Sequence, residues 1–205
     1  MSKITERKGL VLSKRQQNRR KERKTFIIVC EGKKTEPNYF KQFRVYVKVR
    51  DIDIIGLGAN TITVVEEAIQ QKQENPSAEV WGVFDRDSFQ AQNFNGALNL
   101  AKRKGIKIAY SNQAFEIWFL LHFHYHTTGT NRSLYKKMLS HPKRLGFTYA
   151  KKDTDMYDIL KDRQAIAIQN DERLLQSYSP HHNPEKDNPC TTVHHLVQAL
   201  NEAAV

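Results

Sequence analysis

The chain has 205 residues, enough for one large domain or two small ones, and its apolar content of 39% is ordinary for a globular protein. No apolar run approaches the roughly 20 residues of a membrane-spanning helix, and no secretory signal is visible, so we expect a cytoplasmic protein without a membrane anchor. Cys30 and Cys190 are too few for a disulfide framework, and we expect reduced thiols.

The net charge of +11 is concentrated at the N-terminus. Residues 1–24 contain ten Lys and Arg against two Glu, whereas the other 181 residues contain 23 against 20. The sequence therefore predicts a basic, flexible arm followed by a nearly balanced folded body. Such an arm attracts polyanions, and nucleic acid is the favoured partner. The alternative is a solvated tail that only keeps the protein in solution.

Strands and helices alternate between residues 25 and 125. Short apolar runs rich in β-branched and aromatic residues predict buried strands, and helical spacing of apolar residues predicts a helix after each strand. The expected strands are Thr25–Cys30, Asp51–Leu57, Glu79–Phe84 and Ile106–Tyr110; the expected helices cover 35–47, 61–75, 95–104 and 115–123. Four such units in succession indicate a three-layer α/β domain with a parallel sheet.

Residues 126–205 predict a helical extension packed on this α/β domain. The expected elements are a short helix from Asn131 or Ser133, one longer helix over Asp155–Ser177, a proline-containing loop over Tyr178–Pro189 and a final helix. Within both regions, Thr35 and Thr192 are the expected N-caps of their helices, because a threonine side chain can accept from the first free N–H groups. Thr61 or Thr63 is expected to open its helix.

Acidic residues stand where two of the predicted strands end. Glu31 follows the first strand, and Asp85 and Asp87 follow the third. Chemistry in open α/β sheets gathers outside the carboxyl ends of the strands, so the three carboxylates meet in one crevice if the two strands are neighbours. Carboxylates about 4 Å apart repel by roughly 4 kcal/mol at an effective dielectric near 20. We therefore expect a hard cation, Mg²⁺ or Mn²⁺, between them.

Each of these acids also has a structural interpretation. Glu31 can cap backbone N–H groups at its strand end, and Asp85 or Asp87 alone can form an Asx turn. Glu116 lies among apolar residues of a predicted helix, where an acid must be paired. It either reaches the acidic cleft as a further catalytic residue or caps its own helix.

Basic residues adjoin the acids. Lys33, Lys34 and Arg86 are close in sequence to them and are candidate nucleic-acid-binding residues that would hold flanking phosphates. The alternative for each is an exposed charge without a ligand.

Two other chemistries fit the pattern less well. The alternating histidines His122, His124 and His126 fall where a helix is expected to end, and Cys190 with His194 or His195 has the spacing of only half a zinc site. The FDRDSF segment is similar to the nucleophile motif of haloacid-dehalogenase phosphatases, but that motif normally follows the first strand of its domain, and here it follows the third.

Four segments together resemble the RloB-like family. They are IIVCEGKKTEPNYF, VWGVFDRDSF, ALNLAKRKGIKIAYSNQAFEIWFLLHF and NPCTTVHHLVQAL, and they extend over nearly all of residues 25–200. The resemblance implies a Toprim-like, Rossmann-like fold and a link to restriction-linked and AbiL-type abortive-infection loci. Toprim domains carry an acid after the first strand and a DxD after a later one; Glu31 matches the first, and Asp85 and Asp87 match the second. Gln113 departs from the proline expected in the family pattern.

The resemblance implies a Mg²⁺-dependent nuclease that cleaves RNA or DNA in anti-phage defence. In such an enzyme Asp85 and Asp87 hold the metal, and Glu31 completes the metal shell or accepts a proton from the attacking water. The alternative is a non-catalytic nucleic-acid-binding or regulatory subunit that acts with a partner ATPase of the AAA or ABC type.

Overall fold

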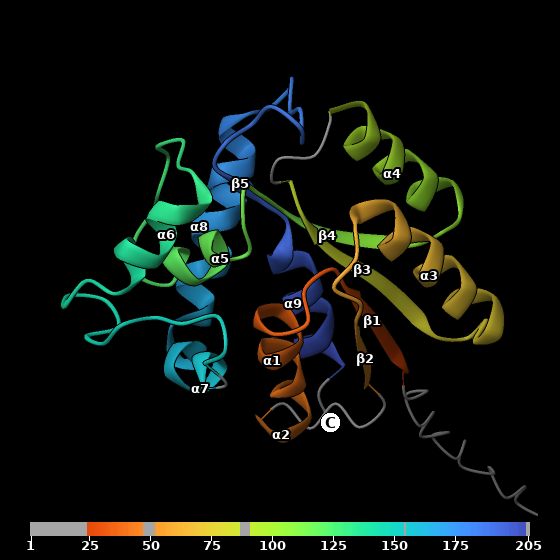
Figure 1. Cartoon of the computed structure of the whole chain (residues 1–205), viewed down its shortest axis with the longest axis horizontal. Coiled ribbons are helices and arrows are strands. Elements are labelled where there is room, and N and C mark those ends of the chain that lie inside the picture. Colours follow the sequence, from red (N-terminus) through yellow and green to blue (C-terminus); the bar gives the residue numbers. More distant parts are fainter. Residues whose placement is uncertain (1–23, 47–51, 87–90, 154, 204–205) are drawn as a thin grey trace, which may run out of the picture.

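A five-stranded sheet in the order β2-β1-β3-β4-β5 forms the centre of the computed structural model, which describes residues 24–46, 52–86, 91–153 and 155–203 (Figure 1). The strands are β1 (Phe26–Cys30), β2 (Ile52–Gly56), β3 (Glu79–Asp85), β4 (Lys107–Asn112) and β5 (Cys190–Thr191). The first four run parallel, as predicted. The short β5 adds an antiparallel edge beside β4. The mixed α/β, Rossmann-like class is thereby confirmed.

The helices cover both faces of this sheet. They are α1 (Thr35–Lys41), α2 (Phe43–Tyr46), α3 (Thr61–Glu74), α4 (Ala91–Arg103), α5 (Glu116–Leu121), α6 (Arg132–Leu139), α7 (Met156–Leu160), α8 (Gln164–Ser177) and α9 (Val193–Glu202), with a 3₁₀ turn at Lys161–Arg163. Figure 1 shows α3 and α4 on one side of the sheet and α1 and α9 on the other.

Alternate residues of β1 divide the core into two parts. Ile28 and Cys30 pack in the larger cluster, which also contains residues of α1, α5, α6, α7, α8 and α9. Ile27 and Val29 pack in the smaller cluster with α3 and α4. A strand with buried side chains on both faces has no polar alternation, and this is why β1 reads as a continuous apolar run. The predicted three layers are confirmed.

Two of the expected helices are divided. The first is split into α1 and α2 around Gln42. The helix expected over 155–177 is split into α7, the 3₁₀ turn and α8, because its two halves pack on different neighbours. In α7, Tyr157 packs against Phe43 of α2 with ring centroids 4.7 Å apart, whereas α8 packs against α5 and α9.

The predicted N-cap of α1 is wrong and that of α9 lacks the expected side-chain bond, whereas α3 begins at Thr61, as one of the two expectations had it. Thr35 is the first residue of α1 and Lys34 takes the cap position without a side-chain hydrogen bond. Asn60 caps α3, because its side chain accepts from Thr63 N–H at 3.0 Å. Thr192 is in the cap position of α9, but its hydroxyl accepts from Tyr110 N–H of β4 instead.

The C-terminal region is mainly helical and also joins the sheet. Cys190 and Thr191 form β5 opposite Asn112 and Ser111 of β4. A two-residue strand is too short to show a period-2 pattern, so the sequence gives no sign of it. The division at residue 125 stays a prediction, as does the basic arm, which lies outside the described residues except for Lys24.

Both cysteines are buried free thiols, as predicted. In the part of the chain that the structure describes, no helix has the length and apolarity needed to cross a membrane.

Candidate functional site

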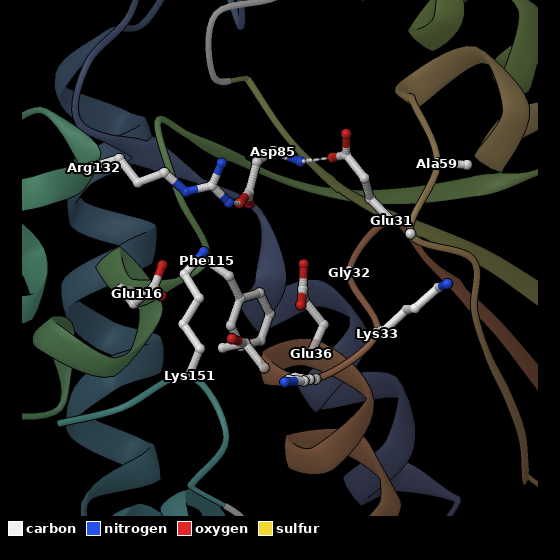
Figure 2. A pocket seen from close by; sticks show the side chains of 13 residues that line it. Glu31, Gly32, Lys33, Glu36, Ala59, Asp85, Phe115, Glu116, Arg132 and Lys151 are labelled. Carbon is white, nitrogen blue, oxygen red and sulfur yellow. Dashed lines mark hydrogen bonds and ion pairs between the residues drawn. The ribbon is translucent and has the colours of Figure 1, made fainter.

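A cavity of about 390 Å³ opens at the carboxyl ends of β1 and β3 (Figure 2). The turn after β1 forms one wall, the segment before α3 another, and the start of α5, the start of α6 and the turn before α7 complete it. Its acidic lining residues are Glu31, Glu36, Asp85 and Glu116, and its basic ones are Lys33, Lys34, Arg132 and Lys151. This one site therefore contains five predicted residues and, in addition, Glu36, Arg132 and Lys151, which the sequence analysis did not predict.

Glu31 and Asp85 are neighbours because β1 and β3 are adjacent in the sheet. Glu31 N–H donates to Val83 O at 2.8 Å, and Asp85 N–H donates to Glu31 Oε2 at 2.9 Å. The glutamate thus caps the end of β3, which is the structural role considered for it above. Asp87, the third predicted acid, lies outside the described residues.

Asp85 is a buried carboxylate with an arginine on one oxygen. Its Oδ2 accepts from Arg132 Nη2 at 2.9 Å, and only 3% of the residue is exposed. Its Oδ1 is buried and has no hydrogen-bond partner among the described residues. Burial raises the pKa of Asp85 well above its usual range; the charges of Glu36 and Glu116 raise it further, and Arg132 lowers it. The folded protein therefore holds this negative charge at an energetic cost.

Glu36 is an acid of the site that the sequence did not reveal. It lies in the first turn of α1, is 5% exposed and points into the cavity (Figure 2). Its carboxylate fills the space above Gly32, where an added Cβ would lie 2.4 Å from Glu36 Oε2. A side chain at position 32 would displace this carboxylate. Burial raises the pKa of Glu36; its own backbone N–H lowers it, and the charge of Glu116 raises it again.

Glu116 lies in the cavity wall as the first residue of α5. It is 4% exposed, and its Oε1 accepts from Tyr149 O–H at 3.1 Å. The cap position of α5 is taken by Phe115, which makes no side-chain hydrogen bond. Of the two alternatives, the geometry favours the one that places this acid at the cleft.

The basic residues are partly those expected. Lys33 and Lys34 line the cavity, whereas Arg86 is not among its lining residues, and its backbone N–H donates to Ser111 O at 2.7 Å. Arg132 and Lys151 take part instead, and they come from the region after residue 125. Neither stands in a motif, so only the folded chain brings them to the acids.

A hard divalent cation fits this set of oxygen atoms. Among the described residues no three His, Cys, Asp or Glu side chains form a metal-binding group. Mg²⁺ does not need three, because it is commonly held by one or two carboxylates together with water and substrate phosphates. The buried Oδ1 of Asp85, which has no partner among the described residues and belongs to a cavity that Glu31 and Glu36 also line, is suited to such an ion.

Zinc does not fit the described histidines. His122 Nδ1 donates to Trp118 O at 2.9 Å, and His126 bonds Thr130 Oγ1 at 3.1 Å. His194 Nδ1 contacts Asp171 Oδ2 at 2.7 Å as a buried pair. Each of these three rings makes a contact within the fold, and the described histidines belong to no group of three His, Cys, Asp or Glu side chains that could hold a metal.

The comparisons with known proteins give one family. The family of RloB-like proteins matches residues 26–200. The chain belongs to the RloB-like family. No curated protein and no solved structure matches it.

The RloB-like match includes every charged residue of the cavity, from Glu31 to Lys151. The site is thus part of the matched region. Residues 1–25, which contain the predicted basic arm, lie outside that region.

Proposed function

We propose that this RloB-like protein is a Mg²⁺-dependent nuclease that cleaves phosphodiester bonds of RNA or DNA. The observation that carries the proposal is the buried carboxylate of Asp85, which has one oxygen without a partner among the described residues and faces a cavity lined by further acids and by basic side chains. Phosphoryl transfer needs carboxylate oxygens to hold the metal and positively charged side chains to hold the anionic substrate, and this cavity contains both.

The acids have separate roles in this proposal. Asp85 holds the cation, with Glu31 and Asp87 as its proposed partners, and Glu31 also fixes the backbone of Asp85 through their hydrogen bond. The metal, when bound, polarises a phosphoryl oxygen and neutralises the charge that develops during an in-line displacement. Glu36 accepts the proton of the attacking water, because it faces the cavity and its raised pKa makes it a stronger base than an ordinary glutamate.

The basic side chains hold the substrate. Lys33 and Lys34 follow β1 on one side of the cavity, and Arg132 and Lys151 belong to the C-terminal region. A phosphodiester between them is held by charge-assisted hydrogen bonds, which are shorter and stronger than neutral ones. The basic N-terminal arm adds sequence-independent attraction to the nucleic acid.

The wider context is also part of the proposal. A Toprim-like nuclease in an abortive-infection or restriction-linked locus attacks nucleic acid during phage infection, and a partner ATPase of the AAA or ABC type controls it. The support for this is the family membership together with the acids at the ends of β1 and β3.

The test is cleavage by the purified protein. Transfer RNA, plasmid and single-stranded DNA are incubated with and without Mg²⁺ and Mn²⁺, and Asp85→Asn is compared with the wild type. We expect metal-dependent cleavage that Asp85→Asn abolishes. Glu79→Gln is the matched control, because Glu79 is the acid at the opposite end of β3 and pairs with Lys107 at 2.7 Å. Equal cleavage by Asp85→Asn and the wild type excludes the proposal.

One observation favours the second candidate function, a non-catalytic binding subunit. Asp85 is already paired with Arg132. If the Asp85–Arg132 pair is permanent, the cavity has no place for a metal, and the other basic side chains can still bind a phosphate group there. Under this alternative the protein binds nucleic acid equally well with and without divalent cations and cleaves none of the substrates.

A further inference from the structure

Arg132 is the positive charge that the structure places beside Asp85, on the carboxylate oxygen next to the one that has no partner among the described residues. Its Nη2 lies 2.9 Å from Asp85 Oδ2, and Figure 2 shows its guanidinium reaching this carboxylate from across the cavity. We propose that Arg132 is the resident counter-ion of the metal site: a divalent cation displaces it, and the released guanidinium then binds a phosphate of the substrate. This inference rests on the proposed function, because it concerns the same cavity.

The acids explain why a counter-ion is needed. Asp85 is almost fully buried, and the carboxylates of Glu36 and Glu116 line the same cavity. A buried carboxylate beside two others is unfavourable without a positive charge close to it. Arg132 supplies a single charge, whereas a divalent ion supplies two and can contact several oxygen atoms at once.

The position of Arg132 allows it to leave. Its side chain is 41% exposed, whereas that of Asp85 is 4% exposed. It is the first residue of α6, and the helix is capped by Asn131, whose side chain accepts from Leu134 N–H. The helix start is thus fixed without the Arg132 side chain, so the guanidinium can turn toward the cavity mouth while the backbone stays in place.

The charges of the cavity favour the exchange. Four acidic and four basic side chains line it, so in their ionised forms these residues sum to zero. A divalent ion makes the cavity positive by two charges, which favours an anionic ligand at the moment when the guanidinium is released. Arginine suits that ligand, because its planar fork binds two phosphate oxygens side by side.

The first experiment measures Mn²⁺ binding by calorimetry in the full chain. Arg132→Ala is expected to bind Mn²⁺ about fivefold or more tightly than the wild type, because the competitor for Asp85 is gone. Arg173→Ala is the matched control: this arginine lies over the Tyr125 ring at 4.2 Å and is not among the cavity residues. Unchanged or weaker Mn²⁺ binding by Arg132→Ala, or no Mn²⁺ binding by the wild type, overturns the inference.

The second experiment measures binding of a fluorescein-labelled oligothymidine in saturating Mn²⁺ by fluorescence anisotropy, before any cleavage. Arg132→Ala is expected to weaken binding about tenfold, and Arg132→Lys by less, since lysine keeps the charge but not the fork. Equal binding by Arg132→Ala and the wild type overturns the phosphate role. If Arg132→Ala does not fold, as judged by circular dichroism, Arg132→Gln replaces it in both experiments.

These outcomes are separate from those of the cleavage test. A protein that shows opposite changes in Mn²⁺ and oligothymidine affinity but cleaves nothing supports the inference and refutes the nuclease. Metal-dependent cleavage together with unchanged Mn²⁺ affinity in Arg132→Ala supports the nuclease and refutes the inference.

Discussion

The hydrogen bond between Glu31 and Asp85 allows the structural and chemical roles of Glu31 to be separated. Its Oε2 accepts from the part-buried Asp85 N–H at 2.9 Å. Glu31→Ala removes this acceptor and leaves the N–H group beside a cavity. Hydrogen bonds to charged groups contribute about 1.5–3 kcal/mol, so we expect Glu31→Ala to lower the free energy of unfolding by about 2 kcal/mol.

Glu31→Gln is the matched variant, because the glutamine amide oxygen still accepts from Asp85 N–H. The hydrogen bond then changes from charged to neutral, and we expect a loss of about 1 kcal/mol or less. Cleavage is expected to disappear in both variants, since neither the alanine methyl group nor the neutral glutamine amide balances the charge of the cation.

The assay is urea unfolding followed by tryptophan fluorescence, for which the buried Trp118 and Trp81 are suitable probes. A Glu31→Ala protein within about 0.5 kcal/mol of the wild type refutes the capping role, because that is the range of ordinary surface substitutions. A Glu31→Gln protein that cleaves like the wild type refutes the catalytic role and leaves Glu31 as a structural cap.

Three further substitutions test the fold around the site. Burial lowers the pKa of His122 to about 4, so about 3 kcal/mol of stability is present above pH 6.5 and is lost as the pH falls through 4. Urea unfolding of His122→Phe should show no such pH-dependent loss of stability, and a pH profile identical to that of the wild type contradicts this prediction. Asp171→Ala leaves His194 without its buried partner and should reduce the free energy of unfolding by about 3 kcal/mol, whereas an unchanged melting temperature contradicts the pairing. Gly58→Ala should lower the free energy of unfolding by about 1 kcal/mol, because φ is +64° at this position. It should also displace Lys33 and so weaken oligothymidine binding, and a variant with wild-type stability and wild-type binding refutes the prediction.

The sequence predicts the parts of the site that local chemistry determines. An apolar run followed by an acid is sufficient to locate Glu31 and Asp85, because a strand buried on both faces must be apolar and its end must meet the ligand edge of the sheet. Their adjacency depended on strand order, which the structure confirms by pairing β1 with β3. Asp87 lies outside the described residues, and its place in the site stays a prediction.

The other part of the site depends on long-range packing. Arg132 and Lys151 come from a helix start and a turn without a motif, and they line the cavity only because α6 packs beside α5 and Tyr149, near Lys151, bonds Glu116 of α5. The position of Glu36 could have been predicted from the sequence. It lies in the first turn of a helix that starts at the carboxyl end of β1, and this places it near Glu31. The division of the helix over 155–177 has the same cause as the position of Arg132, namely contacts with distant elements.

The central claim is that Asp85 holds a divalent cation. The most direct measurement is Mn²⁺ binding by calorimetry to the wild type, to Asp85→Asn and to the Glu79→Gln control. Saturable binding that is lost in Asp85→Asn and kept in Glu79→Gln is the predicted result. Equal Mn²⁺ affinity in Asp85→Asn and the wild type contradicts the claim, because the buried carboxylate at the end of β3 would then not be a ligand.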